Sequence, residues 1–466
     1  MLARRSVRFY VDRMTCRTAH GPAALLLGLV SLLMGSVGSA AAADRPNIVL
    51  IISDDQAWFD YGFMGHPHIR TPHLDQLAAE SVTFTRGYVP SSLCRPSLLS
   101  MMTGLQPHEH GVVGNDPPVP DALAELSKAQ LRDNAQYQQV REDFLHFVDE
   151  SDTLADVLSA AGYRTHQSGK WWEGSYQRGG FTDGMTHGDR SRDGRHGDRG
   201  LIIGRKTMEP VTAFIDDAVA EDKPFFVYYA PFLPHAPHNP PERLLKKYAK
   251  ASPHPSIRKY YAMCEWFDET CGTLLDHLEQ SGAADNTVVM YVCDNGWITR
   301  NDSSRYAERS KRSQYEGGIR TPIMVKAPGV APRMDTDHAV SSLDLMPTAL
   351  NALGLDVPSD LPGIDLLDEA AVAERDTLTG EIFLHDVQSM TDHVASLRFR
   401  WIIRDGWKLV VPHGPVEPDA PVELFHLALD PHETRNLAEA YPDRVAELTQ
   451  ALDAWWSPGE AAMASR

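Results

Sequence analysis

The sequence has little positive charge, and this shortage excludes one class of binding partner. Among its 466 residues, 44 are Lys or Arg and 63 are Asp or Glu, which gives a formal net charge of −19. Because proteins bind nucleic-acid phosphates with clustered Lys and Arg, we expect no nucleic-acid partner. An acidic protein that binds an anion must gather its few cations at one place.

Cysteine is also scarce, with 5 residues in the whole chain. Those that follow the N-terminal segment are Cys94, Cys264, Cys271 and Cys293. So few cysteines over this length do not form a disulfide framework. Cys264 and Cys271 share a segment with a helical pattern, and about 10 Å along the helix would separate them, too far for a disulfide. We expect both in the core, whereas a free Cys94 in an exported protein needs another explanation.

Long hydrophobic runs are missing, apart from one near the N-terminus at residues 23–37. Small residues follow it at 38–43, and a basic region precedes it, formed by Arg4, Arg5, Arg8, Arg13 and Arg17. This order predicts a secretory signal peptide over residues 1–43. The run is shorter than the roughly 20 apolar residues of a membrane span, although an uncleaved anchor is the alternative. We therefore expect an exported protein, periplasmic or secreted, that does not span the membrane after signal cleavage.

Short apolar runs that end abruptly in polar residues are the clearest pattern after the signal. These runs lie at 47–52, 163–167, 224–229 and 287–292. Continuous β-rich runs with helical segments between them predict a mostly parallel sheet with helices on both faces. We expect such helices at 73–81, 153–161, 209–220 and 263–281. Since ligands bind beyond the carboxyl ends of strands in α/β sheets, the polar residues after these runs should converge on one site.

The pattern changes after about residue 370, which predicts two parts in the mature chain. Residues 44–370 are the predicted α/β catalytic domain, and residues 371–466 the predicted C-terminal subdomain. In the second part, runs at 396–401 and 406–411 predict paired antiparallel strands, and residues 443–456 predict an amphipathic helix. We interpret the polar, helix-prone residues 116–150 as an insertion. Residues 187–205, rich in Gly, Arg, Asp and His, are interpreted as a mobile loop.

The segment Pro90-Ser-Ser-Leu-Cys94-Arg-Pro-Ser-Leu98 resembles the active-site motif of the formylglycine-dependent sulfatases. In that family the cysteine of a Cys-x-Pro-x-Arg motif is oxidised to formylglycine. Further landmarks follow in the family's order: Asp54-Asp55, Gly169-Lys170-Trp171, Pro234-His235, Asp294-Asn295-Gly296, Lys311 and Glu316-Gly-Gly-Ile-Arg320. Each pattern is weak alone, but together they are specific and extend over nearly all of the mature chain. The resemblance implies the alkaline-phosphatase-like α/β fold and a maturing enzyme, such as the formylglycine-generating enzyme, as a partner.

The resemblance implies hydrolysis of a sulfate ester, either of a carbohydrate or of a small aryl alcohol, by a nucleophile made from Cys94. A hydrated aldehyde, the 3-oxoalanine (formylglycine) side chain, carries two hydroxyls on one carbon. One attacks sulfur, and loss of a proton from the other then expels sulfate, so that hydrolysis becomes two easier steps. The alternative for Cys94 is a buried structural thiol.

Asp54, Asp55, Asp294 and Asn295, together with the group at Cys94, resemble the family's metal ligands. Carboxylate and amide oxygens are hard donors, which suit Ca²⁺ or Mg²⁺ and not a soft metal. We favour Ca²⁺ because it tolerates crowded, irregular oxygen shells. The alternative is that these residues cap strands and form turns, where Asp and Asn are common.

Lys170, His235 and Lys311 occupy the family's positions for the groups that contact the sulfate ester. The resemblance implies that both lysines stabilise its negative charge, and that His235 gives a proton to the leaving group. The alternatives are solvated surface lysines and a hydrogen-bonded loop histidine.

Two positions depart from the family pattern. Leu98 stands where the motif has Arg, and Trp172 stands where many members have a histidine that helps to deprotonate the hydrated aldehyde. We hypothesise that His187, Arg190, Arg195 and His196 refill the site from their loop; a merely solvated loop is the alternative.

Two other functions remain open on the sequence. A phosphomonoester or phosphonate-ester hydrolase would use the same scaffold, but the greater charge of a phosphate monoester calls for more cations or a second metal. The sequence has no His-rich signature of a second metal site. A catalytically inactive, sulfatase-like binding protein would account for Leu98 and Trp172, whereas the other landmarks argue for an enzyme.

Overall fold

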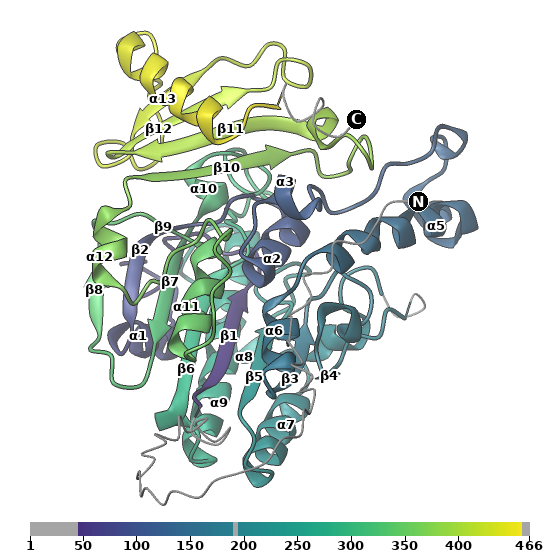
Figure 1. Ribbon diagram of the computed structural model, residues 1–466, viewed down its shortest axis with the longest axis vertical. Helices are drawn as coiled ribbons and strands as arrows, with labels where there is room; N and C mark the ends of the chain where they lie inside the picture. Colours follow the sequence, from purple (N-terminus) through teal and green to yellow (C-terminus); the bar gives the residue numbers. More distant parts are fainter. Residues whose placement is uncertain (1–44, 190–193, 459–466) are drawn as a thin grey trace, which may run out of the picture. The chain divides into compact units, whose positions relative to one another are not determined.

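The computed structural model describes residues 45–189 and 194–458, and Figure 1 shows their arrangement. The predicted signal peptide, residues 1–43, lies outside the described residues, as does Arg190. Among the helices of the described part, none combines the length and the apolar character that crossing a membrane requires.

A mostly parallel sheet forms the centre of the fold, as predicted. Its strand order is β4-β3-β5-β1-β6-β7-β2-β8, and β9 also pairs with β2. The strands are β1 (Asn47–Ser53), β2 (Val82–Tyr88), β3 (Arg164–Gly169), β4 (Asp183–Gly184), β5 (Phe225–Ala230), β6 (Thr287–Cys293), β7 (Arg320–Lys326), β8 (Arg333–Asp335) and β9 (Val340–Ser341). The strand β7 runs antiparallel to both β6 and β2, which the sequence pattern did not predict.

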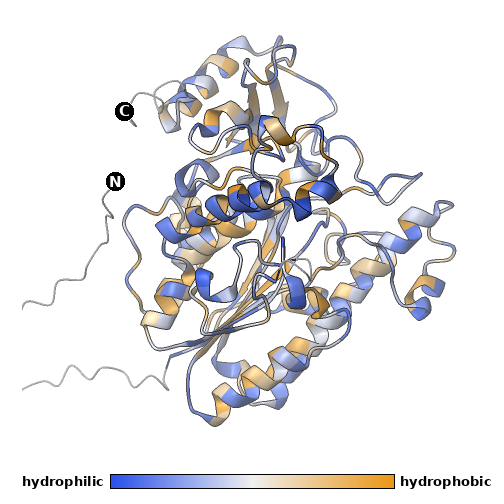
Figure 2. Ribbon diagram, turned by 90° about the vertical axis from the view of Figure 1, so that its right-hand side faces the viewer, coloured by the Kyte–Doolittle hydropathy of each residue, from blue (hydrophilic) through white to orange (hydrophobic). Residues whose placement is uncertain are grey.

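The central strands are apolar throughout because helices cover both faces of the sheet. Every residue of β1, β5 and β6 is buried. Along β1, Leu50 belongs to one hydrophobic core and Ile51 to the other, as the alternation of side chains in a strand requires. In Figure 2 the strands are mostly orange, whereas the helices beside them alternate between orange and blue.

Two groups of helices enclose these cores. The helices α2 (Cys94–Thr103), α6 (Leu154–Ala160) and α11 (Leu345–Ala352) pack on one face of the sheet. The helices α1 (Pro72–Ala79), α7 (Glu209–Ala220) and α9 (Pro255–Gln280) pack on the other. The prediction for α7 is confirmed, but α9 begins at Pro255 and not at residue 263. Pro255 lies at the start of the helix, where proline is well tolerated.

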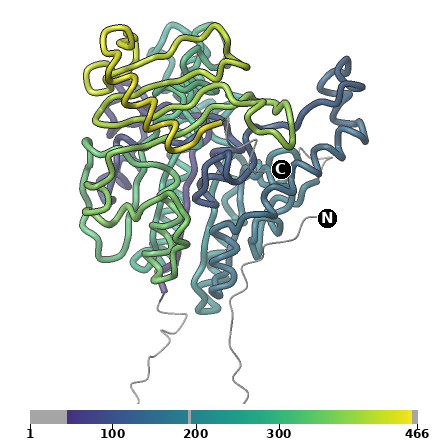
Figure 3. Tube along the Cα trace, turned by 45° about the horizontal axis from the view of Figure 1, so that its top comes forward, coloured from purple at the N-terminus to yellow at the C-terminus, as the bar shows by residue number. Residues whose placement is uncertain are grey.

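A second sheet follows, with strands β10 (Thr377–Phe383), β11 (Leu397–Arg404), β12 (Trp407–Pro412) and β13 (Glu423–His426), all antiparallel. The helix α13 (Pro442–Trp455) packs its Leu448 and Leu452 against this sheet. Figures 1 and 3 show this yellow-green sheet beyond the end of the main sheet where β1 finishes. The predicted strand pair and closing helix are therefore confirmed.

The remaining elements connect the two sheets or lie at their edges. The insertion at 116–150 is helical, as expected, and contains α4 and α5. The short α-helices are α3 (Pro107–His110), α4 (Lys128–Asp133), α5 (Ala135–Leu145), α8 (Glu242–Lys247), α10 (Glu316–Ile319) and α12 (Glu369–Glu374). The 3-10 helices are Asp121–Leu123, His146–Glu150, Tyr176–Gly179, Asp198–Ile202, Ala284–Asn286, Ser342–Asp344 and His393–Ser396. All the cysteines of the described part are buried and free, including Cys264 and Cys271.

His166 on β3 makes the stability of this fold sensitive to acid. Its ring packs 4.8 Å from the ring of Phe214, and neither ring nitrogen has a hydrogen-bond partner among the described residues. Burial lowers the pKa of His166 from 6.5 to about 4. The unfolded chain therefore binds a proton below pH 6.5 that the folded chain does not, so stability is lost as the pH falls from 6.5 to 4.

We expect His166→Phe to remove this sensitivity. Between pH 7 and pH 5, the free energy of unfolding of the variant should fall by about 2 kcal/mol less than that of the wild type, at about 1.4 kcal/mol per pH unit below 6.5. Urea unfolding at both pH values measures the difference, with His146→Gln at an exposed position as the control. Equal losses in His166→Phe and the wild type would contradict the prediction.

Candidate active site

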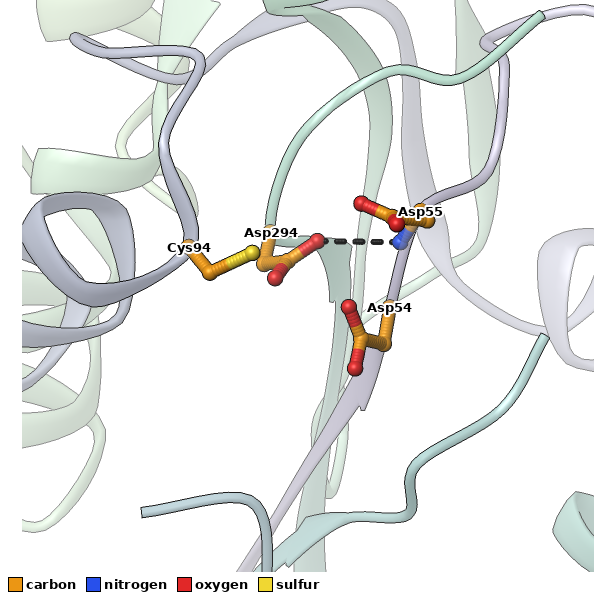
Figure 4. Close-up of side chains that lie close together, drawn as sticks. All are labelled: Asp54, Asp55, Cys94 and Asp294. Atoms are coloured by element: carbon orange, nitrogen blue, oxygen red, sulfur yellow. Dashed lines mark hydrogen bonds between the residues drawn. The ribbon is translucent and has the colours of Figure 1, made fainter. Parts of the chain in front are cut away.

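Polar residues from four strands of the main sheet meet at its carboxyl edge. Asp54 and Asp55 directly follow β1, and Asp294 directly follows β6. The main chains of these two segments are joined, since the Asp294 N–H donates to the Ser53 carbonyl at 2.9 Å. Asp55 has a φ of 66°, in the left-handed region that Asp tolerates better than most residues. In Figure 4 the side chain of Asp294 lies between that of Cys94 and those of Asp54 and Asp55, and a dashed line joins Asp294 to the Asp55 N–H.

Lys170 reaches the same place because Gly169 ends β3 in an unusual conformation. Gly169 has a φ of 86°, and a Cβ atom there would lie 1.9 Å from the Ala230 carbonyl oxygen of the neighbouring strand. Only glycine fits such an approach. The Lys170 N–H then donates to that carbonyl at 2.7 Å, which fixes the chain as it enters the site.

Cys94 is the first residue of α2, and its thiol is buried at the centre of the site. The Lys311 ammonium lies 3.0 Å from the Cys94 Sγ, and the Asn295 Oδ1 lies 3.4 Å from it. Burial raises the pKa of the Cys94 thiol to about 11, although Lys170 and Lys311 oppose this shift. An unmodified thiol therefore stays protonated at neutral pH, and the thiol is a much weaker nucleophile than the thiolate.

The carboxylates of the site form a crowded group that fits a cation. One ligand atom from each of Asp54, Asp55, Cys94 and Asp294 lies within 4.8 Å of the others. The Oδ2 atoms of Asp54 and Asp55 are buried without a hydrogen-bond partner among the described residues. Burial and the neighbouring carboxylates raise the pKa of Asp54, and they raise that of Asp294 to about 7. Oxygen donors with unused lone pairs and mutual repulsion suit a hard divalent cation.

Two buried lysines balance part of this negative charge. The Lys170 Nζ lies 2.6 Å from the Asp54 Oδ1 and 3.3 Å from the Asp294 Oδ2. The Lys311 ammonium donates to the Asp55 Oδ1 as well as contacting Cys94. Burial alone would lower the pKa of each lysine, but the neighbouring carboxylates raise both above the usual value. Both lysines are therefore charged, and the acidic chain has concentrated cations where an anion would bind.

His235 lies beside the carboxylates on the segment that follows β5. Its Nε2 is 3.4 Å from the Asp55 Oδ2, and its ring stacks on Phe232 with centroids 4.2 Å apart. The Nδ1 lies 2.6 Å from the Ala236 carbonyl, which can only accept, so Nδ1 carries a proton. Burial is the main cause that lowers the pKa of His235 far below its usual value, so the ring is neutral at neutral pH. Its Nε2 is the nitrogen left to exchange a proton within the site.

The arginine next to Cys94 does not replace the one missing at position 98. Leu98 packs in the hydrophobic core between α2 and the main sheet. The Arg95 guanidinium instead binds Glu173, with its Nε 2.7 Å from the Oε1, and donates to the Phe144 carbonyl at 3.1 Å. This buried pair ties the start of α2 to the segment after Lys170, a link that no pattern in the sequence indicated.

Side chains of the loop hypothesised to refill the site pack around Trp172 and its neighbours. Trp172 is buried, and the ring of His196 lies 5.2 Å from the rings of both Trp172 and Phe232. Arg195 covers Trp172, with its Cζ 4.5 Å from the ring centroid, but its Nε donates to Asp116. The ring of His187 packs on Tyr176. Of the three hypothesised residues that the structure describes, His196 is thus the one that contacts both Trp172 and the aromatic ring under His235.

Comparisons with known proteins agree with this geometry. The sulfatase family model matches residues 46–355, and the model "N-sulphoglucosamine sulphohydrolase, C-terminal" matches residues 306–455. Arylsulfatase A of Homo sapiens is 30% identical over 384 residues, which cover 72% of this chain and 70% of the relative. The N-acetylgalactosamine-6-sulfatase of Mus musculus is 27% identical over 503 residues, which cover 94% of this chain and 90% of the relative.

Solved structures show the same fold at lower identity. Ps i-CgsB in complex with k-i-k-neocarrahexaose has a TM-score of 0.69 at 22% identity, with 88% of this chain and 93% of that chain covered. The phosphonate monoester hydrolase of Agrobacterium radiobacter has a TM-score of 0.63 at 19% identity, and the match covers 88% of this chain and 96% of that chain. The fold alone therefore does not separate sulfate from phosphonate esters, but the family models and relatives do. The chain belongs to the sulfatase family, and it is a sulfuric ester hydrolase.

Proposed function

We propose that this sulfatase removes sulfate from a carbohydrate, with formylglycine made from Cys94 as the nucleophile. The observation that supports this most is the position of the Cys94 side chain, close to both the Lys311 ammonium and the carboxylates that follow β1 and β6. A group at this place meets both a cation for the sulfate oxygens and oxygen ligands for a metal. The names of several similar proteins refer to sugars or sulfated sugars, which favours a carbohydrate over a simple aryl ester.

We propose that Asp54, Asp55, Asp294 and Asn295 hold one Ca²⁺, together with the group at position 94; Mg²⁺ is the alternative. The buried, unpartnered carboxylate oxygens support a hard cation. When present, the cation would polarise a sulfate oxygen, and formylglycine would supply the hydroxyl that attacks sulfur.

Two lysines of the site bind the negative charge of the sulfate, and two aromatic rings exclude water from them. Lys170 and Lys311 are held in place by carboxylates, so they stabilise the sulfate oxygens without having to reorganise. The ring of Phe232 lies 5.7 Å from the Lys170 Nζ, and that of Trp297 lies 5.7 Å from the Lys311 Nζ. These aromatic rings keep bulk water from the two ammonium groups, which strengthens their attraction for an anion.

His235 is placed to move a proton at its Nε2. Its Nδ1 is held by the Ala236 carbonyl, so only the Nε2 edge faces the site. We propose that the ring takes up a second proton and gives it from Nε2 to the departing oxygen of the alcohol.

We expect His235→Gln to lower kcat by about 10²- to 10⁴-fold on an alkyl or sugar sulfate, because general acid catalysis contributes about that much. On 4-nitrophenyl sulfate the loss should be much smaller, since nitrophenolate leaves readily without a proton. Turnover of both esters by the wild type and the variant measures the contrast. Equal losses on the two esters would show that His235 acts in some other way.

The mass of the peptide that contains Cys94 tests the proposed nucleophile directly. The protein should be made in a host that has the maturing enzyme, and cut with a protease other than trypsin, because Pro96 blocks cleavage after Arg95. Loss of sulfur and two hydrogens with gain of one oxygen is the expected change. An unmodified thiol, in a host that matures a control sulfatase, would overturn the proposal and would indicate an inactive or differently activated relative.

We also propose that residues 1–43 direct export and are then removed, which places the enzyme in the periplasm or outside the cell. The basic region and the short apolar run support this. The N-terminal sequence of the protein recovered from the producing cells tests it: a start near residue 44 is expected, and an intact N-terminus would contradict it.

A further inference from the structure

Arg312, the residue after Lys311, has a side chain whose hydrogen-bonding capacity the protein leaves unused. Its Nε is buried without a hydrogen-bond partner, and no carboxylate in residues 45–189 or 194–458 forms an ion pair with its guanidinium group. Its backbone is nevertheless fixed: its N–H donates to the Ser92 carbonyl, and its own carbonyl accepts from Arg398, both at 3.1 Å. A shielded guanidinium donor without a partner is costly, so a fixed one suggests a ligand.

One side of Arg312 faces an aromatic wall of the active site. Its Cζ lies 5.7 Å from the ring centroid of Tyr306, and Tyr306 packs on Trp297 with centroids 5.4 Å apart. Trp297 in turn lies 6.5 Å from the ring of His235 and covers the Lys311 ammonium. Tyr306 and Trp297 therefore form a continuous aromatic contact from Arg312 to the proposed leaving-group side of the site.

The other side of Arg312 faces a chain of polar contacts from distant segments. Burial is the main cause that lowers the pKa of His385, and the nearby charge of Arg312 lowers it further. The His385 Nδ1 lies 3.8 Å from Asp116, which binds Arg195, and Arg195 covers Trp172. Arg312 is thus close both to the aromatic rings beside His235 and to the polar contacts that reach Trp172.

The charges of this region explain why Arg312 differs from its neighbours. Arg195 is neutralised by Asp116, and Arg95 is neutralised by Glu173. Arg312 keeps its full charge for a ligand in a chain whose formal net charge is −19. Its planar group presents parallel N–H donors that match the oxygens of a carboxylate or a sulfate.

We propose that Arg312 binds a second anionic group of the substrate, next to the sulfate ester that Lys170 and Lys311 hold. The substrate is then an acidic sulfated saccharide, which carries a carboxylate or a further sulfate close to the ester that is cleaved. This inference rests on the proposed function, because it takes the site at Cys94 as the place where the ester binds.

Binding of unreactive anions tests the inference independently of turnover. We would titrate the metal-loaded protein with benzenesulfonate, which has one anionic group, and with 2-sulfobenzoate and benzene-1,2-disulfonate, which each have two. Calorimetry on the wild type should show about tenfold tighter binding of at least one dianion, the size expected for one charge-assisted contact. Whichever dianion binds more tightly identifies the second group as carboxylate or sulfate.

In Arg312→Gln the preference for the dianion should disappear, while Arg312→Lys should keep part of it. Arg300→Gln is the matched control, because Arg300 lies on the same connection but is exposed and paired with Asp302. Equal binding of all three anions by the wild type, or an unchanged preference in Arg312→Gln, would overturn the inference. Failure to hydrolyse any sulfate ester would instead contradict the proposed function, whatever the anions show.

Discussion

Cys94→Ala is expected to abolish hydrolysis of sulfate esters, with kcat lowered by at least about 10⁴-fold, the scale of losses seen when a nucleophile is removed. The reason is positional. The Cys94 side chain contacts both the Lys311 ammonium and the Asn295 amide, where the proposed nucleophile must meet sulfur. Release of 4-nitrophenol from its sulfate ester, at saturating substrate, measures the loss.

Cys271→Ala is the matched control for this experiment. Cys271 is also buried and free, but it lies on α9 in the core on the other face of the sheet. Its replacement should leave kcat close to that of the wild type and lower the stability of the fold by about 1 kcal/mol. A Cys94→Ala variant with activity within tenfold of the wild type would show that the nucleophile lies elsewhere, for example on a water molecule.

Removal of the metal is expected to eliminate activity and to lower the melting temperature. Without a cation, burial, together with repulsion from the neighbouring carboxylates of Asp54 and Asp55, raises the pKa of Asp294 to about 7. A cation whose free concentration is about 1,000 times its Kd stabilises the folded state by about 4 kcal/mol. Dialysis against a chelator, followed by differential scanning calorimetry and a turnover assay, measures both effects.

Reconstitution decides which metal the site uses. We expect Ca²⁺ to restore both the activity and the melting temperature, and Mg²⁺ to restore less, because Mg²⁺ demands near-octahedral geometry. Asp386→Asn is the control. Asp116, His385 and Asp386 form the other group of possible metal ligands in the described residues. Arg195 already binds Asp116 there. This variant should retain one bound metal. Full activity in protein shown to be free of metal would exclude the proposed role of Ca²⁺.

Much of the fold could be predicted because its signals are local. The run of apolar residues from Asn47 to Ser53 is buried on both faces, and such runs are typical of strands inside a parallel sheet. The strands predicted at 396–401 and 406–411 pair as the hairpin of β11 and β12, although its turn includes Gly406, with a φ of 75°. The antiparallel β7 was not predicted, because a short buried strand has the same composition in either direction.

The sequence by itself determined the members of the site. Acid, amide, lysine and histidine residues follow the strands of one sheet, and parallel strands end at the same edge, so Asp54, Lys170, His235 and Asp294 had to lie close together. The motif around Cys94 added the nucleophile. The inference for the residues after the strands needs only the direction of each strand, whereas Cys94 and Lys311 were indicated by the family resemblance.

Only the tertiary structure decided which charged side chains have an ion-pair or hydrogen-bond partner and which have none. The sequence alone does not reveal that Arg95 binds Glu173, that Arg195 binds Asp116, or that Arg312 remains without a carboxylate partner among the described residues. These contacts join segments far apart in the chain, and their free energies depend on distance, burial and neighbouring charge. Side-chain pairing of this kind leaves no periodic pattern, so it becomes visible only when the chain is folded.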